Sequence, residues 1–114
     1  MTLPPLQHQL AEKLLTEFCA RRSPPELRDK IRVEFAIKGN RVTITENRPY
    51  FLDPHQWTTT KVAVLDYDAK AATWELFCFD RNERRMPYHD TGPTADLAAL
   101  ISEVDADPTA IFWG

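Results

Sequence analysis

The sequence predicts an α+β fold, with an N-terminal helix, an antiparallel sheet of about five strands built from hairpins, and a C-terminal helix. Apolar side chains recur at helical spacing near both ends of the chain, and they alternate with polar ones in the middle. The 114 residues are 43% hydrophobic and 27% charged, as in ordinary globular proteins. We therefore expect a single domain over residues 1–114.

The first predicted element is a helix over residues 4–22. Pro4 and Pro5 suit a first helical turn, where a missing N–H is not needed. A broad apolar stripe follows, made of Leu6, Leu10, Ala11, Leu14, Leu15 and Phe18. The prolines after Ser23 end the helix.

Residues 31–48 form the clearest element, a hairpin with a two-residue turn at Gly39-Asn40. The turn sets the register, which pairs Lys38 with Arg41, Ile37 with Val42, Phe35 with Ile44 and Val33 with Glu46. In that register Glu46 and Arg48 continue the core-facing side of the hairpin.

Residues 49–60 contain prolines and threonines and are expected to form a loop, whose Tyr50, Phe51 and Trp57 pack down onto the domain. Residues 61–68 and 73–80 are expected to form a second hairpin. The strand at 73–80 has apolar side chains on both faces, which predicts a strand covered on both sides. Pro87 places a short strand at 85–89 on the edge of the sheet.

The last predicted helix covers residues 95–104 and has Thr94 as its N-cap. Its buried stripe consists of Leu97, Leu100, Ile101 and Val104. The apolar end of the chain, with Phe112 and Trp113, is expected to be docked on the domain.

Composition narrows the class of protein. The net charge of -3 argues against a nucleic-acid coat protein. Residues 1–48 carry nine basic and six acidic side chains, whereas residues 90–114 carry five acids and no Lys or Arg. Cys19 and Cys78 lie beside phenylalanines and suit a reducing compartment. With no apolar run long enough for a bilayer, we expect a soluble cytoplasmic protein that does not bind membranes.

The chain resembles a bacterial family of unknown function, the domain-of-unknown-function family numbered 3024. The most specific shared stretch runs from Asp107-Pro108 to Phe112-Trp113-Gly114. Further shared motifs are Glu46-Asn47-Arg48-Pro49, Asp53-Pro54, Gln56-Trp57, Val62-Ala63, Trp74, Leu76-Phe77, Asp80-Arg81-Asn82, Tyr88, Asp96-Leu97, Leu100 and Glu103-Val104-Asp105. Met86-Pro87 departs from the family pattern, which more often has an aromatic residue there. The resemblance implies a bacterial cytoplasmic protein and brings no assigned activity with it.

One candidate ligand site lies at the open end of the first hairpin. A half-buried arginine among aromatic side chains is suited to grip a carboxylate or phosphate. The candidate ligand-binding residues are Glu46, Arg48, Tyr50 and Trp57. The alternative is a structural ion pair that closes the sheet, since half-buried charges are usually paired.

Neither a metal site nor a cofactor site is indicated. Glu103, Asp105 and Asp107 oppose the dipole of the last helix, and pairing with arginines offsets this more simply than a cation does. The three histidines and two cysteines do not have zinc-site spacing.

Basic residues near the turns are the candidates for nucleic-acid contact. Arg81, Arg84 and Arg85 lie together, with Lys38 and Arg41 at the first hairpin turn. The alternative is a solvated surface, which the net acidity of the chain favours.

No catalytic constellation is present, which favours a non-enzymatic interaction or binding module. One version is a homodimer formed through an exposed strand edge. The alternatives are a small ligand-acting enzyme with its pocket at Glu46, Arg48 and Trp57, and weak nucleic-acid binding through the turn arginines.

Overall fold

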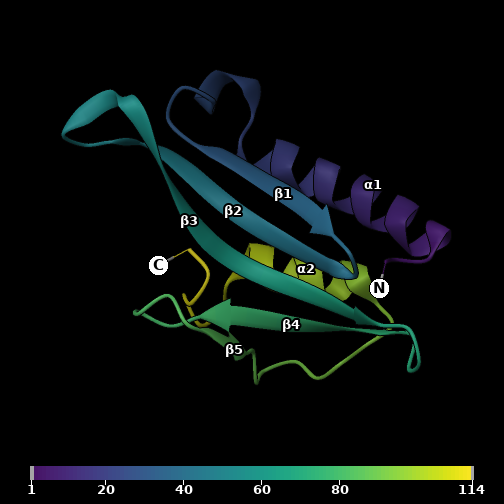
Figure 1. The fold of residues 1–114 in the computed structure, drawn as a ribbon. Coiled ribbons are helices and arrows are strands. Elements are labelled where there is room, and N and C mark those ends of the chain that lie inside the picture. Colours follow the sequence, from purple (N-terminus) through teal and green to yellow (C-terminus); the bar gives the residue numbers. More distant parts are fainter. Residues whose placement is uncertain (1, 114) are drawn as a thin grey trace.

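The computed structural model describes residues 2–113, and it confirms the α+β class with an N-terminal helix, five antiparallel strands and a C-terminal helix (Figure 1). In chain order the elements are α1 (Pro5–Arg22), the 3-10 turn η1 (Pro25–Leu27), β1 (Arg32–Lys38), β2 (Arg41–Tyr50), β3 (Asp53–Asp68), β4 (Thr73–Phe79), β5 (Arg85–Pro87) and α2 (Leu97–Ala106).

The sheet is a meander in which every strand pairs antiparallel with the strand that follows it, in the order β1-β2-β3-β4-β5. The predicted register of the first hairpin is confirmed, from Lys38 opposite Arg41 to Val33 opposite Glu46. Gly39 has a φ of 63°, whereas Asn40 is not among the residues of positive φ. This combination is typical of a type II′ turn, whose first central residue is usually glycine.

The expectation of a loop over residues 49–60 is wrong. β2 continues to Tyr50 and β3 begins at Asp53, so a two-stranded arm extends beyond the end of β1 (Figure 1). Each strand of the arm pairs on one side only, and its other side has no neighbouring strand. Pro49 and Pro54 can therefore lie in these strands, because the N–H that proline lacks is not needed for a sheet hydrogen bond there. The run Thr58-Thr59-Thr60 favours extended backbone.

The tip of this arm does not pack onto the domain as predicted. Phe51 is 84% exposed and Leu52 is 70% exposed.

Both helices cover the same face of the sheet (Figure 1). The expectation that β4 is covered on both faces is therefore wrong. Trp74, Leu76 and Cys78 face the helices and are buried, whereas Phe77 and Phe79 lie on the other face and stay half-buried. There the guanidinium of Arg85 covers the ring of Phe77, with its carbon 4.6 Å from the ring centroid.

The core lies between the helices and the covered face of the sheet. Apolar side chains of α1 and α2 meet those of β1 to β4 in one cluster, whose fully buried members include Leu15, Phe18, Val42, Ile44, Leu65, Trp74, Leu76, Leu100 and Val104. The helical and alternating periodicities of the sequence are the patterns that create these two apolar surfaces.

The N-cap of α2 is Asp96 and not Thr94, because the Asp96 carboxylate accepts a hydrogen bond from the Ala99 N–H at 3.1 Å. Thr94 instead forms a β-bridge with Trp74.

The predicted docking of the chain end is confirmed. The Phe112 side chain is 6% exposed, and the Trp113 ring N–H donates to the Val104 carbonyl at 2.7 Å. No helix among residues 2–113 is long and apolar enough to cross a membrane.

Candidate functional site

The free edge of β1 is the feature of this fold best suited to contact another molecule. In a two-residue hairpin the closing pair, Lys38 and Arg41, exchanges both backbone hydrogen bonds, and every second pair along the ladder does the same. The β1 residues of the intervening pairs do not bond to β2. These residues, Val33, Phe35 and Ile37, therefore direct their N–H and C=O groups away from β2. Within residues 2–113, no hydrogen bond reaches the outward backbone groups of Phe35 or Ile37.

Ser23 closes one end of this edge. Its hydroxyl accepts a hydrogen bond from the outward N–H of Val33 at 3.2 Å and donates one to the Cys19 carbonyl at 2.8 Å. The side chain is 2% exposed and joins the end of α1 to the start of β1. At the other end, the Gly39 carbonyl accepts a hydrogen bond from the Leu3 N–H at 3.3 Å, so the open part of the edge is limited to the stretch from Phe35 to Lys38.

A shallow groove of about 350 Å³ lies between α1 and the first half of β1. The side of α1 that lines it carries the small side chains of Thr16, Cys19 and Ala20. Arg28, Val33, Glu34 and Phe35 complete the lining. Small side chains on the helix leave room for a backbone to approach the strand edge.

The thiol in this groove is not a nucleophile at neutral pH. Burial, followed by the nearby Glu34 carboxylate and against the opposing effect of Arg28, raises the pKa of Cys19 to about 11. Because the thiolate is the reactive form, Cys19 serves here as a small apolar surface.

The opposite edge of the sheet is protected. β5 has three residues and contains Pro87, which has no N–H to offer. Beyond β5, the edge of β4 is bonded by neighbouring chain, since the Tyr88 N–H donates to the Leu76 carbonyl and Thr94 exchanges two hydrogen bonds with Trp74. β1 has seven residues with no proline and no irregularity in its register. The two edges therefore differ in their capacity to accept another strand.

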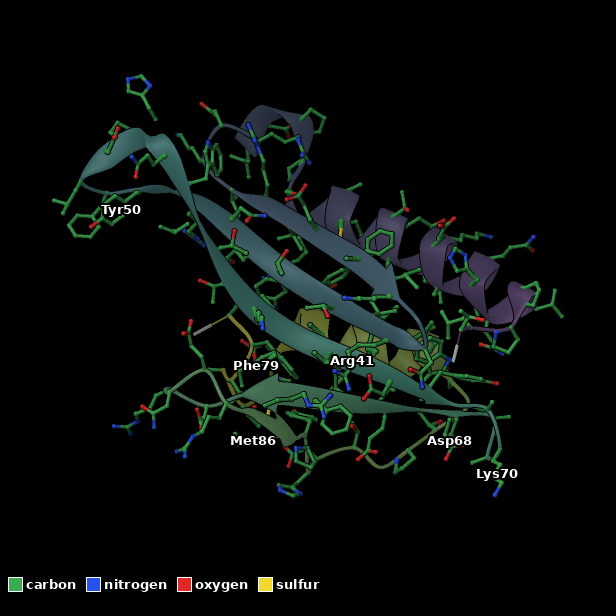
Figure 2. The ribbon with its side chains drawn as sticks, in the orientation of Figure 1. Arg41, Tyr50, Asp68, Lys70, Phe79 and Met86 are labelled. Carbon is green, nitrogen blue, oxygen red and sulfur yellow. The ribbon has the colours of Figure 1, made fainter. Side chains whose placement is uncertain are left out.

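The structure separates the predicted ligand-binding residues into three places. Glu46 and Arg48 lie on the helix-covered side of β2 and pair with each other, with Arg48 Nε 2.8 Å from Glu46 Oε1. Trp57 belongs to the opposite face, where the Arg32 guanidinium lies 4.0 Å from its ring centroid. Tyr50 lies near the end of the arm, edge-on to the Phe51 ring (Figure 2).

The turn arginines Arg84 and Arg85 have intramolecular partners. Arg84 Nε lies 3.2 Å from the Asp80 carboxylate, and Arg85 reaches Asp66 at 3.2 Å. Asp66 also accepts two hydrogen bonds from Arg41. Arg81 is exposed on the turn between β4 and β5.

Each of the three acids near the end of α2 has a partner. Tyr88 donates its hydroxyl hydrogen to Glu103 at 2.6 Å, and Arg22 pairs with Asp105 at 3.1 Å. Asp107 accepts from the N–H groups of Phe112 and Trp113, each at 3.0 Å. Among residues 2–113, His, Cys, Asp and Glu side chains form no group of three that could hold a metal ion.

Sequence reasoning considered an exposed strand edge but did not locate it. The signal is present in the hairpin order, since a meander that begins at residue 31 leaves its first strand without an outer neighbour. The role of Ser23 had no signal in the sequence, because its partner Val33 lies ten residues further along, beyond a 3-10 turn.

Comparison with known proteins identifies the family of the chain. Neither the curated proteins nor the solved structures gave a match. The family model for the domain of unknown function DUF3024 matches residues 3–114. The chain therefore belongs to the DUF3024 family.

Proposed function

We propose that this protein is a non-enzymatic interaction module that binds an extended protein segment along the free edge of β1. The observation that carries the proposal is the pair of outward-facing residues, Phe35 and Ile37, whose backbone groups are unbonded in the described part of the chain. An added strand satisfies these groups through main-chain hydrogen bonds, as in other cases of strand addition.

The surroundings of the edge support binding over catalysis. The groove beside it offers a protonated Cys19 thiol, and the one carboxylate in its lining, Glu34, raises the pKa of that thiol instead of activating it and accepts a hydrogen bond from Asn47 at 2.6 Å. Glu34 and Arg28 give it one charge of each sign. A groove of this kind accommodates side chains of a bound strand while the main chain supplies the affinity.

The setting that we propose for this activity is the cytoplasm of a bacterial cell. Cys19 and Cys78 are both free thiols, which supports a reducing compartment. The family resemblance of the sequence supports the bacterial part of this proposal.

A selection of linear peptides against the immobilised protein tests the proposal, with a phage-displayed library of nonapeptides as the probe. Selected peptides are then titrated by fluorescence anisotropy against the wild type, Ile37→Pro and Ile37→Val. Proline removes the outward N–H without breaking a bond to β2, and valine keeps it with a similar side chain. We expect Ile37→Pro to weaken binding about tenfold, the equivalent of roughly 1.4 kcal/mol for one hydrogen bond, and Ile37→Val to bind like the wild type.

Amide chemical shifts provide a second measurement that does not depend on a variant folding. The N–H signals of Phe35 and Ile37 are expected to move most on peptide binding and to exchange more slowly with solvent. The proposal is rejected if the protein is monomeric and selects no linear peptide, if Ile37→Pro binds as tightly as the wild type, or if the shifted amides lie on another strand.

A further inference from the structure

We infer that the segment added to β1 is the β1 strand of a second copy of this chain, so that two sheets join into one continuous antiparallel sheet. This inference rests on the edge-binding role proposed above and specifies its partner. Three features of β1 lead to it: the positions of its free backbone groups, the order of its charges and the shape of the adjacent groove.

The backbone groups select one register. In an antiparallel pair, residues with outward N–H and C=O groups must lie opposite each other. If the two-fold axis passes through Ala36, Phe35 lies opposite the partner's Ile37 and Ile37 opposite the partner's Phe35. All the free groups of both residues are then bonded. A pairing centred on Phe35 instead requires the N–H of Val33, which already donates to Ser23.

The charges of β1 favour the same register. With the axis at Ala36, Glu34 lies opposite the partner's Lys38, and symmetry repeats this pair of opposite charges on the other side. The side chains of Glu34, Ala36 and Lys38 belong to the face of the sheet that the helices leave open, and all three are exposed. A pairing centred on Phe35 sets Arg32 opposite the partner's Lys38, and one centred on Glu34 sets two carboxylates against each other. Like charges directly opposite destabilise a strand pair, and opposite charges stabilise it.

The helix-covered face gains apolar contacts in this register. Phe35 and Ile37 are half-buried in the single chain. In the pair of chains, Phe35 lies beside the partner's Ile37, and Ile37 lies beside the partner's Phe35. Strand pairing between the copies is confined to Phe35 and Ile37, because the Val33 N–H and the partner's Gly39 carbonyl, which come opposite each other, are already bonded to Ser23 and Leu3 of their own chains. Beside this point Thr16, Cys19 and Ala20 of α1 have small side chains, none larger than a threonine, which leave room for the partner's Gly39-Asn40 turn.

A charge-swap experiment tests the partner and the register together, with oligomeric state measured by sedimentation velocity. In a dimer of Glu34→Lys, a lysine at position 34 lies opposite Lys38 of the other copy. In a dimer of Lys38→Glu, two glutamates lie opposite each other at the same positions. Each variant alone is expected to dissociate at about tenfold higher concentration than the wild type, since two like-charge contacts replace two attractive ones. An equimolar mixture of the two variants restores two opposite-charge contacts and is expected to dimerise like the wild type.

Charge-matched controls are available at exposed positions away from β1. Glu17→Lys on α1 and Lys61→Glu on β3 make the same changes in net charge, and both positions are exposed. Both variants are expected to dimerise like the wild type. Dimerisation of the mixture also shows that the two swap variants fold.

A disulfide gives an independent readout of the axis. In the proposed register the two Ala36 residues form a pair without backbone hydrogen bonds, with Cα atoms about 4.5 Å apart, which lies within disulfide range. Ala36→Cys is expected to form a covalent dimer on mild oxidation, whereas Thr43→Cys on β2 is not.

The possible failures are distinguishable from failure of the proposed function. A wild type that stays monomeric, while selected peptides still bind at Phe35 and Ile37, rejects self-pairing and leaves the interaction module in place. A dimer that neither charge swap weakens has its interface elsewhere and also rejects the inference.

Discussion

The hydroxyl of Ser23 accepts a hydrogen bond from the Val33 N–H at 3.2 Å, and through it the end of α1 is bonded to the first outward residue of β1. Ser23→Ala leaves this buried N–H without a partner. We expect the free energy of unfolding to fall by about 1–3 kcal/mol, measured by urea denaturation. Ser102→Ala on the exposed side of α2 is the control and is expected to change stability by less than about 0.5 kcal/mol. Equal stabilities of the two variants would show that the Ser23 hydroxyl is not the link.

Asp107 closes the C-terminal end of α2 in two ways. Its backbone is left-handed, with a φ of 47°, and its carboxylate holds the N–H groups of Phe112 and Trp113. Asp107→Ala is expected to cost about 2–4 kcal/mol, because it loses both hydrogen bonds and because alanine tolerates left-handed backbone less well than aspartate. Asp107→Asn is expected to cost less, since asparagine tolerates this conformation and keeps one acceptor oxygen. A thermal unfolding series that gives the reverse order contradicts this explanation of the cap.

The hydroxyl of Tyr88 donates to the Glu103 carboxylate at 2.6 Å and connects the chain after β5 to α2. Tyr88→Phe is expected to lower the free energy of unfolding by about 1–3 kcal/mol, since a hydrogen bond to a charged acceptor is lost. Tyr67→Phe is the matched control: its ring is similarly buried, and its hydroxyl makes no hydrogen bond within residues 2–113. A loss of the same size in both variants would assign the effect to the rings.

Alkaline pH provides a second test of the same bond. Burial, followed by the hydrogen bond to Glu103, raises the pKa of Tyr88 from 10.0 to about 12. A raised pKa favours the protonated tyrosine in the folded state, so its contribution to stability is complete below pH 10 and is lost between pH 10 and about 12. The stability advantage of the wild type over Tyr88→Phe should therefore shrink over this interval. An advantage that stays constant to pH 12 would contradict the assignment.

The arm formed by β2 and β3 has an exposed apolar tip, where Phe51 is 84% and Leu52 is 70% exposed. Phe51→Ser and Leu52→Ser are each expected to change stability by less than about 0.5 kcal/mol, because little apolar surface is buried there. Leu76→Ala in the core is the comparison and is expected to cost about 2–5 kcal/mol. A large loss from either serine variant would show that the tip packs against the domain, as the sequence had suggested.

Local pattern determined much of this fold in advance. The alternation in residues 31–48 and the Gly39-Asn40 turn are enough to define the register of the first hairpin, because a two-residue turn allows one pairing only. Pro87 marked the edge strand for a similar reason, since it has no N–H to share. These features depend on neighbours in the sequence, so the sequence alone reveals them.

The tertiary structure decided which charged and aromatic side chains meet. Glu46 and Trp57 are close in sequence, but they belong to opposite faces of the sheet because β2 and β3 continue as paired strands through residues 49–60. Prolines and polar residues in this segment resemble a loop, and only pairing between two strands makes it an arm.

The free edge of β1 also required the complete structure. Ordering the strands shows that β1 is outermost, and the positions of α1 and Ser23 show which of its backbone groups are already bonded. The periodicity of a strand specifies which face its side chains occupy, but backbone N–H and C=O groups are the same for almost every residue. Their partners are therefore set by the three-dimensional neighbours of the strand, and it is these groups on Phe35 and Ile37 that define the proposed site.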